Sequence, residues 1–263
     1  MINFLKYRFL YFLISLVVIG TGLFFVFRFG IPLSIDFAGG SNISYSVNNE
    51  VSNLRTDALS EKEEKELRET IDSESNGEAK ILLFETVGPS VGRETVNKMI
   101  VATALGVLAI LAYIGFAFKG FNFALAAIVA LFHDLLVLIG VYAILSYYFH
   151  AEIDLLFITA ALTTMSFSVH DTIVIFDKIR EYIREEGSKN IEISANRALT
   201  ETMVRSLNNS MTIIFMLLAL ILFGGSTIKF FIISLLIGTI TGTYSSPFIA
   251  TPFLVWIEKR KQK

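Results

Sequence analysis

Six long apolar runs divide this sequence, and they limit its possible folds more than any other feature. A helix of roughly 20 apolar residues is long enough to cross the hydrocarbon core of a bilayer. With 54% hydrophobic residues over 263 positions, the chain is too apolar for a soluble globular domain. We therefore predict a membrane all-α bundle of six transmembrane helices, at residues 9–27, 99–118, 121–149, 155–176, 210–223 and 230–256.

Two of these runs have unusual starts. The first follows Lys6 and Arg8, as the apolar core of a secretory signal does. Because its apolar residues continue to Phe27 and no Ala-x-Ala site follows, we interpret it as a span rather than a cleaved leader. The fifth run is short, so we expect its helix to include polar residues from Arg205 onward.

Basic residues distinguish the two sides of the predicted bundle. Lys and Arg precede the first span, follow the sixth and lie between spans two and three and spans four and five, whereas the short loops 147–154 and 224–228 contain no Lys or Arg. By the positive-inside rule, both termini are cytoplasmic. We predict a cytoplasmic N-terminus with the first span (1–28), an extracytoplasmic domain (29–98) and three further spans (99–176). A cytoplasmic amphipathic helical loop (177–207), two spans (208–257) and a basic cytoplasmic tail (258–263) follow.

The segment between the first two spans is acidic, with 13 Asp and Glu against six Lys and Arg from residue 29 to residue 97. Residues 42–47 and 80–87 have strand patterns, and Ser60 with Glu63 forms a capping-box pattern that opens a helix to Ile71. We predict a small α+β domain of two or three strands on one or two helices. Its helix is charged nearly all round, so we interpret it as solvated rather than as an acidic binding patch.

The composition excludes several kinds of site. The chain contains no Cys, which rules out disulfides, thiolate metal ligands and Cys nucleophiles. Its net charge is -2, and it has no aromatic-and-basic pattern typical of nucleic-acid binding. An intramembrane hydrolase is disfavoured because no nucleophile with a positioned base is evident. We expect no cofactor, no metal and no nucleic-acid partner.

Asp171 interrupts the fourth apolar run and is the strongest candidate for a functional site. A carboxylate at membrane depth is costly, which favours a role for it. Thr164, Ser168 and Asp171, with Thr172, recur at spacings of three and four along the same run, so we predict one helix face whose hydroxyls lead to this carboxylate.

Arg205 opens a second polar stripe, which continues along the fifth run through Asn208, Asn209 and Thr212. Both Arg205 and Asp171 lie toward the cytoplasmic side. Desolvation favours a neutral acid and a nearby Arg favours the charged form, so a contact that forms and breaks would bind and release a proton. Two alternatives stay open: a permanent ion pair that holds two helices together, and an Arg205 that snorkels to the interface.

A histidine precedes each membrane acid, in His133-Asp134 and His170-Asp171. Successive helix residues point about 100° apart, so neither His need contact the following Asp. A metal site built from both pairs is a less favoured alternative, since no His-Glu-x-x-His motif or third ligand is present. Asp134 is either a second proton site or, as we slightly favour, a residue capped by hydroxyls of a neighbouring helix.

The sixth run contains Gly238 and Gly242 at small-xxx-small spacing, followed by Pro247. This pattern predicts a close helix contact and a bend rather than a site.

Several motifs along almost the whole chain resemble those of one family. The outer segment carries its signature residues Asp36, Gly39, Gly40, Gly88, Pro89 and Gly92. His133-Asp134, residues 166–181 around Asp171, Arg205-Ser-Leu, Phe223-Gly-Gly and residues 242–250 follow in order. Together they resemble SecF subunits of the bacterial Sec protein translocase, in the SecD/SecF family of the resistance-nodulation-division (RND) superfamily.

The resemblance implies an accessory subunit that pairs with SecD and uses the proton-motive force to promote late steps of protein export through SecYEG, with SecA, YajC and YidC in the wider complex. It implies a multi-pass, non-enzymatic protein of the bacterial cytoplasmic (inner) membrane, in contact with lipid and with the translocating preprotein. Asp171 and Arg205 would lie on the proton path, with His170 and Asp134 as further candidates. Six spans are half of the twelve in the transporter relatives, which implies that SecD is a separate chain.

Two departures from the family pattern stand out. His170 replaces the usual Asn and introduces a group able to titrate near neutral pH, either as a relay member or only as a hydrogen-bonding substitute. Ser34 replaces a usual Gly. The alternative functions are a structural scaffold subunit without proton coupling, and half of an RND-type small-molecule exporter, which the small outer domain disfavours.

Overall fold

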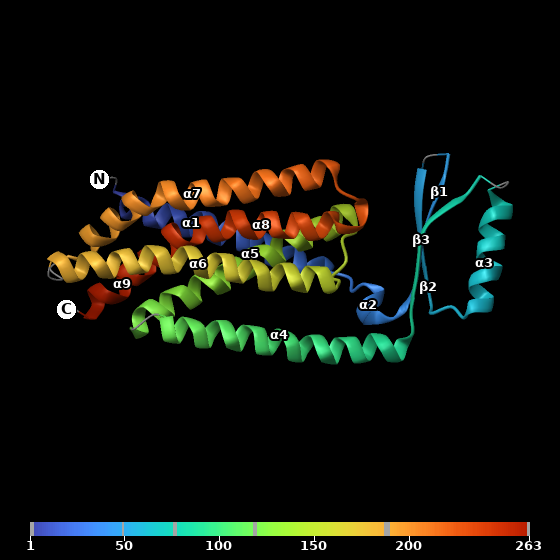
Figure 1. Cartoon of the computed structure of the whole chain (residues 1–263), viewed down its shortest axis with the longest axis horizontal. Helices are drawn as coiled ribbons and strands as arrows, with labels where there is room; N and C mark the ends of the chain where they lie inside the picture. The colour runs from blue at the N-terminus through green and yellow to red at the C-terminus, as the bar shows by residue number, and fades with distance from the viewer. Residues whose placement is uncertain (1–2, 49, 76–77, 118–119, 187–189, 262–263) are drawn as a thin grey trace. The chain divides into compact units, whose positions relative to one another are not determined.

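The computed structural model describes residues 3–48, 50–75, 78–117, 120–186 and 190–261. The chain divides into two compact units. Residues 1–31, 105–151 and 156–263 form a bundle of long helices, and residues 32–104 with 152–155 form a small α+β unit (Figure 1). The predicted helical membrane bundle, with an α+β segment between its first two spans, is confirmed.

Within the described residues, six helical stretches are long and apolar enough to cross a membrane. They comprise α1 (Arg8–Phe29), α4 (Pro89–Ala117), α5 (Phe121–Phe149), α6 (Leu155–Glu186), α7 (Ile191–Phe223) and the consecutive α8 (Lys229–Ser245), π-helix η3 (Ser246–Ala250) and α9 (Thr251–Lys261). The short 3-10 helices η1 (Phe4–Tyr7) and η2 (Ser226–Ile228) precede α1 and α8.

Helices α6 and α7 extend well beyond the spans predicted for them. Segment 177–207 was predicted as an amphipathic helical loop, and most of it is helical as a continuation of these two helices. Charged side chains join the extensions: Lys178 Nζ on α6 lies 2.9 Å from Glu181 Oε1 and 3.0 Å from Glu201 Oε1 on α7. These ion pairs explain why a charged sequence remains helical past the apolar runs.

Burial differs strongly among the helices. In the apolar stretch of each candidate span, half of the residues are buried in α5 and in α6, against 11% in α1, 6% in α4 and 11% in α7. At the crossing of α1 and α5, a Cβ on Gly140 would lie 2.8 Å from the Cα of Gly22, so the two backbones touch there. α5 and α6 therefore form the centre of the bundle.

Small residues also allow α8 to approach α6. A side chain on Gly238 would collide with Thr164, and a Cβ on Gly242 would lie 3.1 Å from the Cα of Ser168. The sequence associated a bend with Pro247, and this residue lies in the π-helix η3 that separates α8 from α9. Such π-helical turns interrupt the regular hydrogen-bond ladder of a helix.

The α+β unit contains an antiparallel sheet of order β2-β1-β3, formed by β1 (Gly40–Val47), β2 (Glu50–Thr56) and β3 (Lys80–Val87). Helices α2 (Ile35–Ala38) and α3 (Glu61–Glu74) complete it. The predicted strand patterns became β1 and β3. The edge strand β2 carries mostly polar residues and lacks a clear apolar alternation, which is why the sequence did not show it.

The predicted helix of this unit begins as expected. Ser60 caps α3, with the reciprocal hydrogen bonds to Glu63 that define a capping box. Ile71 is the buried residue of α3, and most of the helix is exposed, which fits a solvated surface. The guanidinium of Arg68 lies over the ring of Phe84 on β3, 4.7 Å from its centroid.

Candidate functional site

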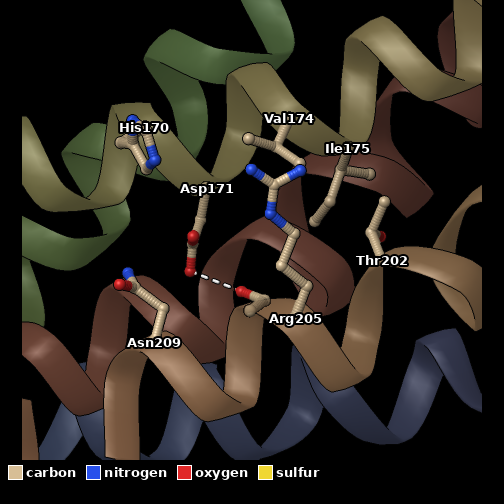
Figure 2. Close-up of a pocket in the computed structure, with 8 residues that line it drawn as sticks. His170, Asp171, Val174, Ile175, Thr202, Arg205 and Asn209 are labelled. Carbon is tan, nitrogen blue, oxygen red and sulfur yellow. Dashed lines mark hydrogen bonds between the residues drawn. The ribbon is translucent and has the colours of Figure 1, made fainter. Parts of the chain in front are cut away.

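Asp171 on α6 is buried, with 8% of its surface exposed. Its Oδ2 accepts a hydrogen bond of 2.6 Å from the hydroxyl of Ser206 on α7, drawn as a dashed line in Figure 2. A buried carboxylate needs donors to offset its lost hydration, and Ser206 supplies one. The sequence did not single out Ser206, although this residue follows the Arg that opens the polar stripe of α7.

A cavity of about 210 Å³ lies between α6 and α7 beside this acid. Its lining residues are His170, Asp171, Val174, Ile175, Thr202, Arg205, Ser206 and Asn209. Figure 2 shows the Arg205 side chain reaching from α7 toward α6, with its guanidinium beside Val174. The cavity is polar on one side and large enough to hold water.

Asp171 and Arg205 share this cavity without forming an ion pair. Among the described residues, the carboxylate contact is with Ser206, and no salt bridge joins the Asp and the Arg. The permanent ion pair that the sequence left open is therefore absent from this conformation. Arg205 is exposed, so its long side chain has room to change position.

The hydroxyls of α6 face α8 and η3. Thr164 and Ser168 lie against the glycines of α8, and Thr172 Oγ1 lies 2.8 Å from Ser246 Oγ in η3. Asp171 instead bonds to α7. The three hydroxyls share one helix face, as expected, but the hydrogen bond of Asp171 is made to another helix, because Asp171 and its neighbour Thr172 point about 100° apart.

The other predicted polar residues lie around the cavity or beside it. His170 is exposed and lines the cavity together with Asn209, whereas Asn208 and Thr212 are exposed outside its lining. Within the part of the chain that the structure describes, no hydrogen bond joins His170 to Asp171.

Asp134 on α5 lies in a second, fully buried polar cluster, with 3% of its surface exposed. Its Oδ2 accepts a 2.6 Å hydrogen bond from Ser245 on α8, and its Oδ1 lies 2.9 Å from Nδ1 of His133. Helix geometry alone does not require His133 to contact Asp134, but the two side chains lie within hydrogen-bond distance in the structure.

The other ring nitrogen of His133 lies 2.9 Å from Oγ of Ser15 on α1. Ser15, His133 and Asp134 thus have the connectivity of a hydroxyl, a base and an orienting acid, which the sequence analysis did not detect. Ser15 is only 6% exposed and sits inside α1, where backbone N–H groups are engaged in the helix. This geometry leaves no evident access for a substrate and no oxyanion donors.

No cluster of three or more His, Asp or Glu side chains that could hold a metal ion occurs in the described ranges. His133 and His170 belong to separate surroundings, the first in the buried cluster and the second on the cavity.

The signature glycines of the outer segment pack against one another. Gly39 and Gly40 have φ values of 74° and 120°, which favour glycine. A Cβ on Gly39 would lie 3.1 Å from the Cα of Pro89, and one on Gly92 would lie 3.0 Å from the N of Gly39. The two signature segments therefore meet at one close backbone contact, whereas a Cβ on Gly88 would have nothing within 4 Å.

Asp36 is placed at the first turn of α6. Its Oδ2 accepts a weak 3.4 Å hydrogen bond from the N–H of Leu155. In the same unit, Arg55 Nη1 lies 2.9 Å from Glu152 Oε1, and residues 33 and 153 form a parallel bridge. These contacts all lie within the α+β unit, which includes residues 152–155.

Comparison with known proteins identifies relatives over nearly the whole chain. Residues 68–260 match the family model described as protein export membrane protein SecD/SecF, C-terminal. The chain is 40% identical to the protein translocase subunit SecF of Thermobaculum terrenum, covering 99% of this chain and 95% of that protein. It is 36% identical to SecF of Anaerolinea thermophila, covering 97% and 94% of the two chains.

Two solved structures have a similar fold. SecDF from Thermus thermophilus, described as a translocon-associated membrane protein, matches with a TM-score of 0.89 at 28% identity over 98% of this chain. A SecDF structure in the super-membrane-facing form matches with a TM-score of 0.73 at 26% identity over 99%. In each case this chain spans only 39% of the SecDF chain.

Proposed function

The chain belongs to the SecF family of protein translocase subunits, and from this premise we propose that it pairs with a SecD subunit and uses the proton-motive force to promote late steps of protein export through the SecYEG channel. Family membership, predicted from the motifs, is confirmed, and it makes the chain a multi-pass membrane protein of Sec-related protein export. The proton coupling, the channel and the remaining partners belong to the proposal.

The pairing with SecD is supported by the SecDF structures. The SecDF chains are much longer than this one, which covers 39% of them, while whole SecF proteins match it almost end to end. A separate SecD chain would supply the remaining part. SecA, YajC and YidC would belong to the wider complex, and the translocating preprotein would meet the α+β unit on the outer side.

The observation that carries the proposal is the buried Asp171 in one cavity with Arg205. In the present arrangement, the hydroxyl of Ser206 contacts the acid and Arg205 does not. This arrangement suits a protonated Asp171, because a neutral acid needs no counter-charge at membrane depth. When the guanidinium moves beside the carboxylate, the ionised form is stabilised and the proton leaves.

His170 and Asp134 are the two further candidates for the proton route. His170 lines the cavity and is exposed, so it is placed to exchange protons between water and the cavity. A hydrogen-bonding substitute for the usual Asn is the alternative role for His170. Asp134 is not part of the cavity lining, so any role in the proton route runs through its own contacts.

The proposed location is the bacterial cytoplasmic (inner) membrane, with both termini in the cytoplasm. The basic residues near the chain ends support this orientation. The weakly buried helices α1, α4 and α7 provide apolar surface for lipid and for SecD. We propose no enzymatic activity, since the work is conformational and the proton gradient supplies its free energy.

The Ser206 contact also favours a second candidate, a scaffold in which Asp171 only holds α6 to α7. Export of a preprotein into inverted vesicles, with and without a proton gradient, separates the two. We expect Asp171→Asn to lose the gradient-dependent part of export while it still assembles with SecD. A normal gradient response in this variant would reject proton coupling and favour the scaffold.

A matched control is available on the same helix. Asp177 on α6 pairs with Arg180 and has a half-exposed side chain. Asp177→Asn makes the same chemical change outside the cavity and should keep the gradient response. Equal amounts of the SecD complex in each vesicle preparation exclude a difference in assembly.

A further inference from the structure

The buried cluster around Asp134 connects three helices of the bundle. Ser15 comes from α1, His133 and Asp134 from α5, and Tyr244 and Ser245 from α8. These contacts lie outside the Asp171 cavity. A His and an Asp in direct contact at such depth are more than the helix packing requires, because apolar side chains would fill the same space without buried polar groups.

The hydrogen bonds around His133 suit two protonation states. Ser15 Oγ lies 2.9 Å from Nε2 of His133, and Ser15 can donate to Tyr244 over 3.5 Å. A hydroxyl can either donate or accept, depending on the rotation of its O–H bond. Ser15 therefore donates to Nε2 when this nitrogen is bare, and accepts from it when it is protonated.

Tyr244 completes this exchange. Its hydroxyl donates a 2.9 Å hydrogen bond to the carbonyl of Tyr11, which leaves its oxygen able to accept the redirected proton of Ser15. Both states of His133 thus have hydrogen-bond partners without movement of heavy atoms.

The charge of the cluster favours an extra proton. An ionised Asp134 beside a neutral His133 leaves one negative charge, and no Lys or Arg in the described residues pairs with this acid. The titratable groups that face it are Tyr244 on α8 and, through its backbone carbonyl, Tyr11 on α1. An uncompensated charge at membrane depth is costly, and one bound proton makes the pair neutral overall.

A short chain of contacts links this cluster to Asp171. Thr172 follows Asp171 on α6 and contacts Ser246, and Ser245, which precedes Ser246, donates to Asp134. The link passes through the start of the π-helix η3, a kind of helical irregularity that is frequent at functional sites. A shift of α6 against α8 would therefore change the hydrogen bond to Asp134.

We propose that His133 and Asp134 form a second proton-binding centre, which holds one exchangeable proton and is coupled to Asp171 through the Thr172–Ser246 contact. The proton is taken up from water and returned to water, and only N–H or O–H bonds form and break. This centre deepens the proposed function and rests on it in one respect: its proton contributes to export only if Asp171 is coupled to the gradient.

The direct test is nitrogen-15 NMR of the complex with SecD in lipid bilayers, with labelled histidine in this chain only. The signals of His133 are assigned by their loss in His133→Gln. Over the pH range in which the complex stays intact, we expect Nε2 to lose its proton as the pH rises while Nδ1 keeps it, because Asp134 accepts from Nδ1. A ring that stays in one protonation state throughout this range would overturn the proposal.

The coupling is tested by the same titration in Asp171→Asn, with Asp177→Asn as the control. We expect the midpoint for His133 to move only in the first variant. An identical midpoint in native chain and Asp171→Asn would overturn the coupling.

An export assay tests the role of this centre in function. It compares Ser245→Ala, which removes a donor to Asp134, with Ser234→Ala. Ser234 is also buried on α8, but its hydroxyl donates to the carbonyl of Phe230 in the same helix. At equal assembly, we expect a severalfold loss of gradient-driven export in Ser245→Ala and little change in Ser234→Ala. Equal export in both would contradict a role for the centre.

The two proposals fail in different ways. A normal gradient response in Asp171→Asn would reject the proposed function while His133 could still titrate. A static His133, together with a lost gradient response in Asp171→Asn, would reject only the second centre.

Discussion

The hydroxyl of Ser206 donates a 2.6 Å hydrogen bond to the carboxylate of Asp171. Arg205, the preceding residue on α7, lines the same cavity. Because successive residues on a helix point about 100° apart, a rotation of α7 would move one of these side chains toward the acid as the other moves away. Two consecutive residues thus offer Asp171 a neutral partner and a charged one.

Replacing Ser206 by Ala tests the neutral partner. The variant removes one donor to a buried acid, and we expect a loss of about 1 kcal/mol in stability of the complex. We also expect weaker gradient-driven export, measured in inverted vesicles. Ser206→Thr keeps a hydroxyl and should retain more activity than the Ala variant. Native export in Ser206→Ala would show that the hydrogen bond is dispensable.

A second prediction concerns the contact of α6 with α8. Gly238→Ala places a methyl group against Thr164, and overpacking of this kind costs about 1 to 3 kcal/mol. We expect a lower unfolding temperature of the purified complex in detergent.

The control for this variant is Gly20→Ala on α1, where an added Cβ has nothing within 4 Å. It should leave the unfolding temperature unchanged or slightly higher, because Ala favours helix more than Gly. The double variant Gly238→Ala with Thr164→Ser should recover part of the loss, since it removes a methyl group at the contact. If Gly238→Ala and Gly20→Ala are equally stable, α6 and α8 do not pack closely there.

The sequence allowed the bundle to be predicted because each span is a long apolar run, and the bilayer leaves few other structures for such runs. Strands β1 and β3 of the α+β unit were also predicted, because their sequences show strand patterns. β2 was not, because an edge strand with polar side chains on both faces resembles a loop. Segment 177–207 was predicted to be helical, but not to continue α6 and α7, because its residues are charged and an ion pair between the two helices lies within it.

The candidate site was predicted only in part. Asp171, Arg205 and Asp134 were conspicuous because charges are rare in apolar runs. Ser206, the partner of Asp171, and Ser15, the partner of His133, were not conspicuous, because a single Ser in a helix is common. Which faces of two helices meet also cannot be derived from the residue spacing along one of them. The contact of His133 with Asp134 depends on the rotamer, which a helical wheel does not give.

A third prediction concerns the contact of Asp36 with Leu155, the first residue of α6. Asp36 accepts from the N–H of Leu155 at the first turn of α6, the helix that carries Asp171. We expect Asp36→Ala to weaken this turn by about 1 kcal/mol, as the loss of a helix cap does. Faster hydrogen exchange of the first amides of α6 would show it. Asp36→Asn keeps an acceptor and should show less change, and equal exchange in the native and Ala forms would contradict the contact.

The last prediction concerns pH and the capping box of α3. The hydroxyl of Ser60 donates a 2.6 Å hydrogen bond to the Glu63 carboxylate, and the backbone N–H of Ser60 donates another of 2.8 Å. Both bonds favour the ionised form and hold the pKa of Glu63 below its ordinary value of 4.5, the hydroxyl contributing most.

A carboxyl whose pKa is lower in the folded state stabilises that state above its unfolded pKa. This stabilisation is lost as the pH falls below 4.5 and through the lowered folded value. We expect protection of the first amides of α3, corrected for intrinsic exchange rates, to fall between about pH 6 and about pH 3. Glu63 is exposed, so the effect should be small and should shrink at high salt. In Glu63→Gln, which cannot ionise, the protection should stay nearly constant, and an equal fall in both chains would assign the pH dependence to another group.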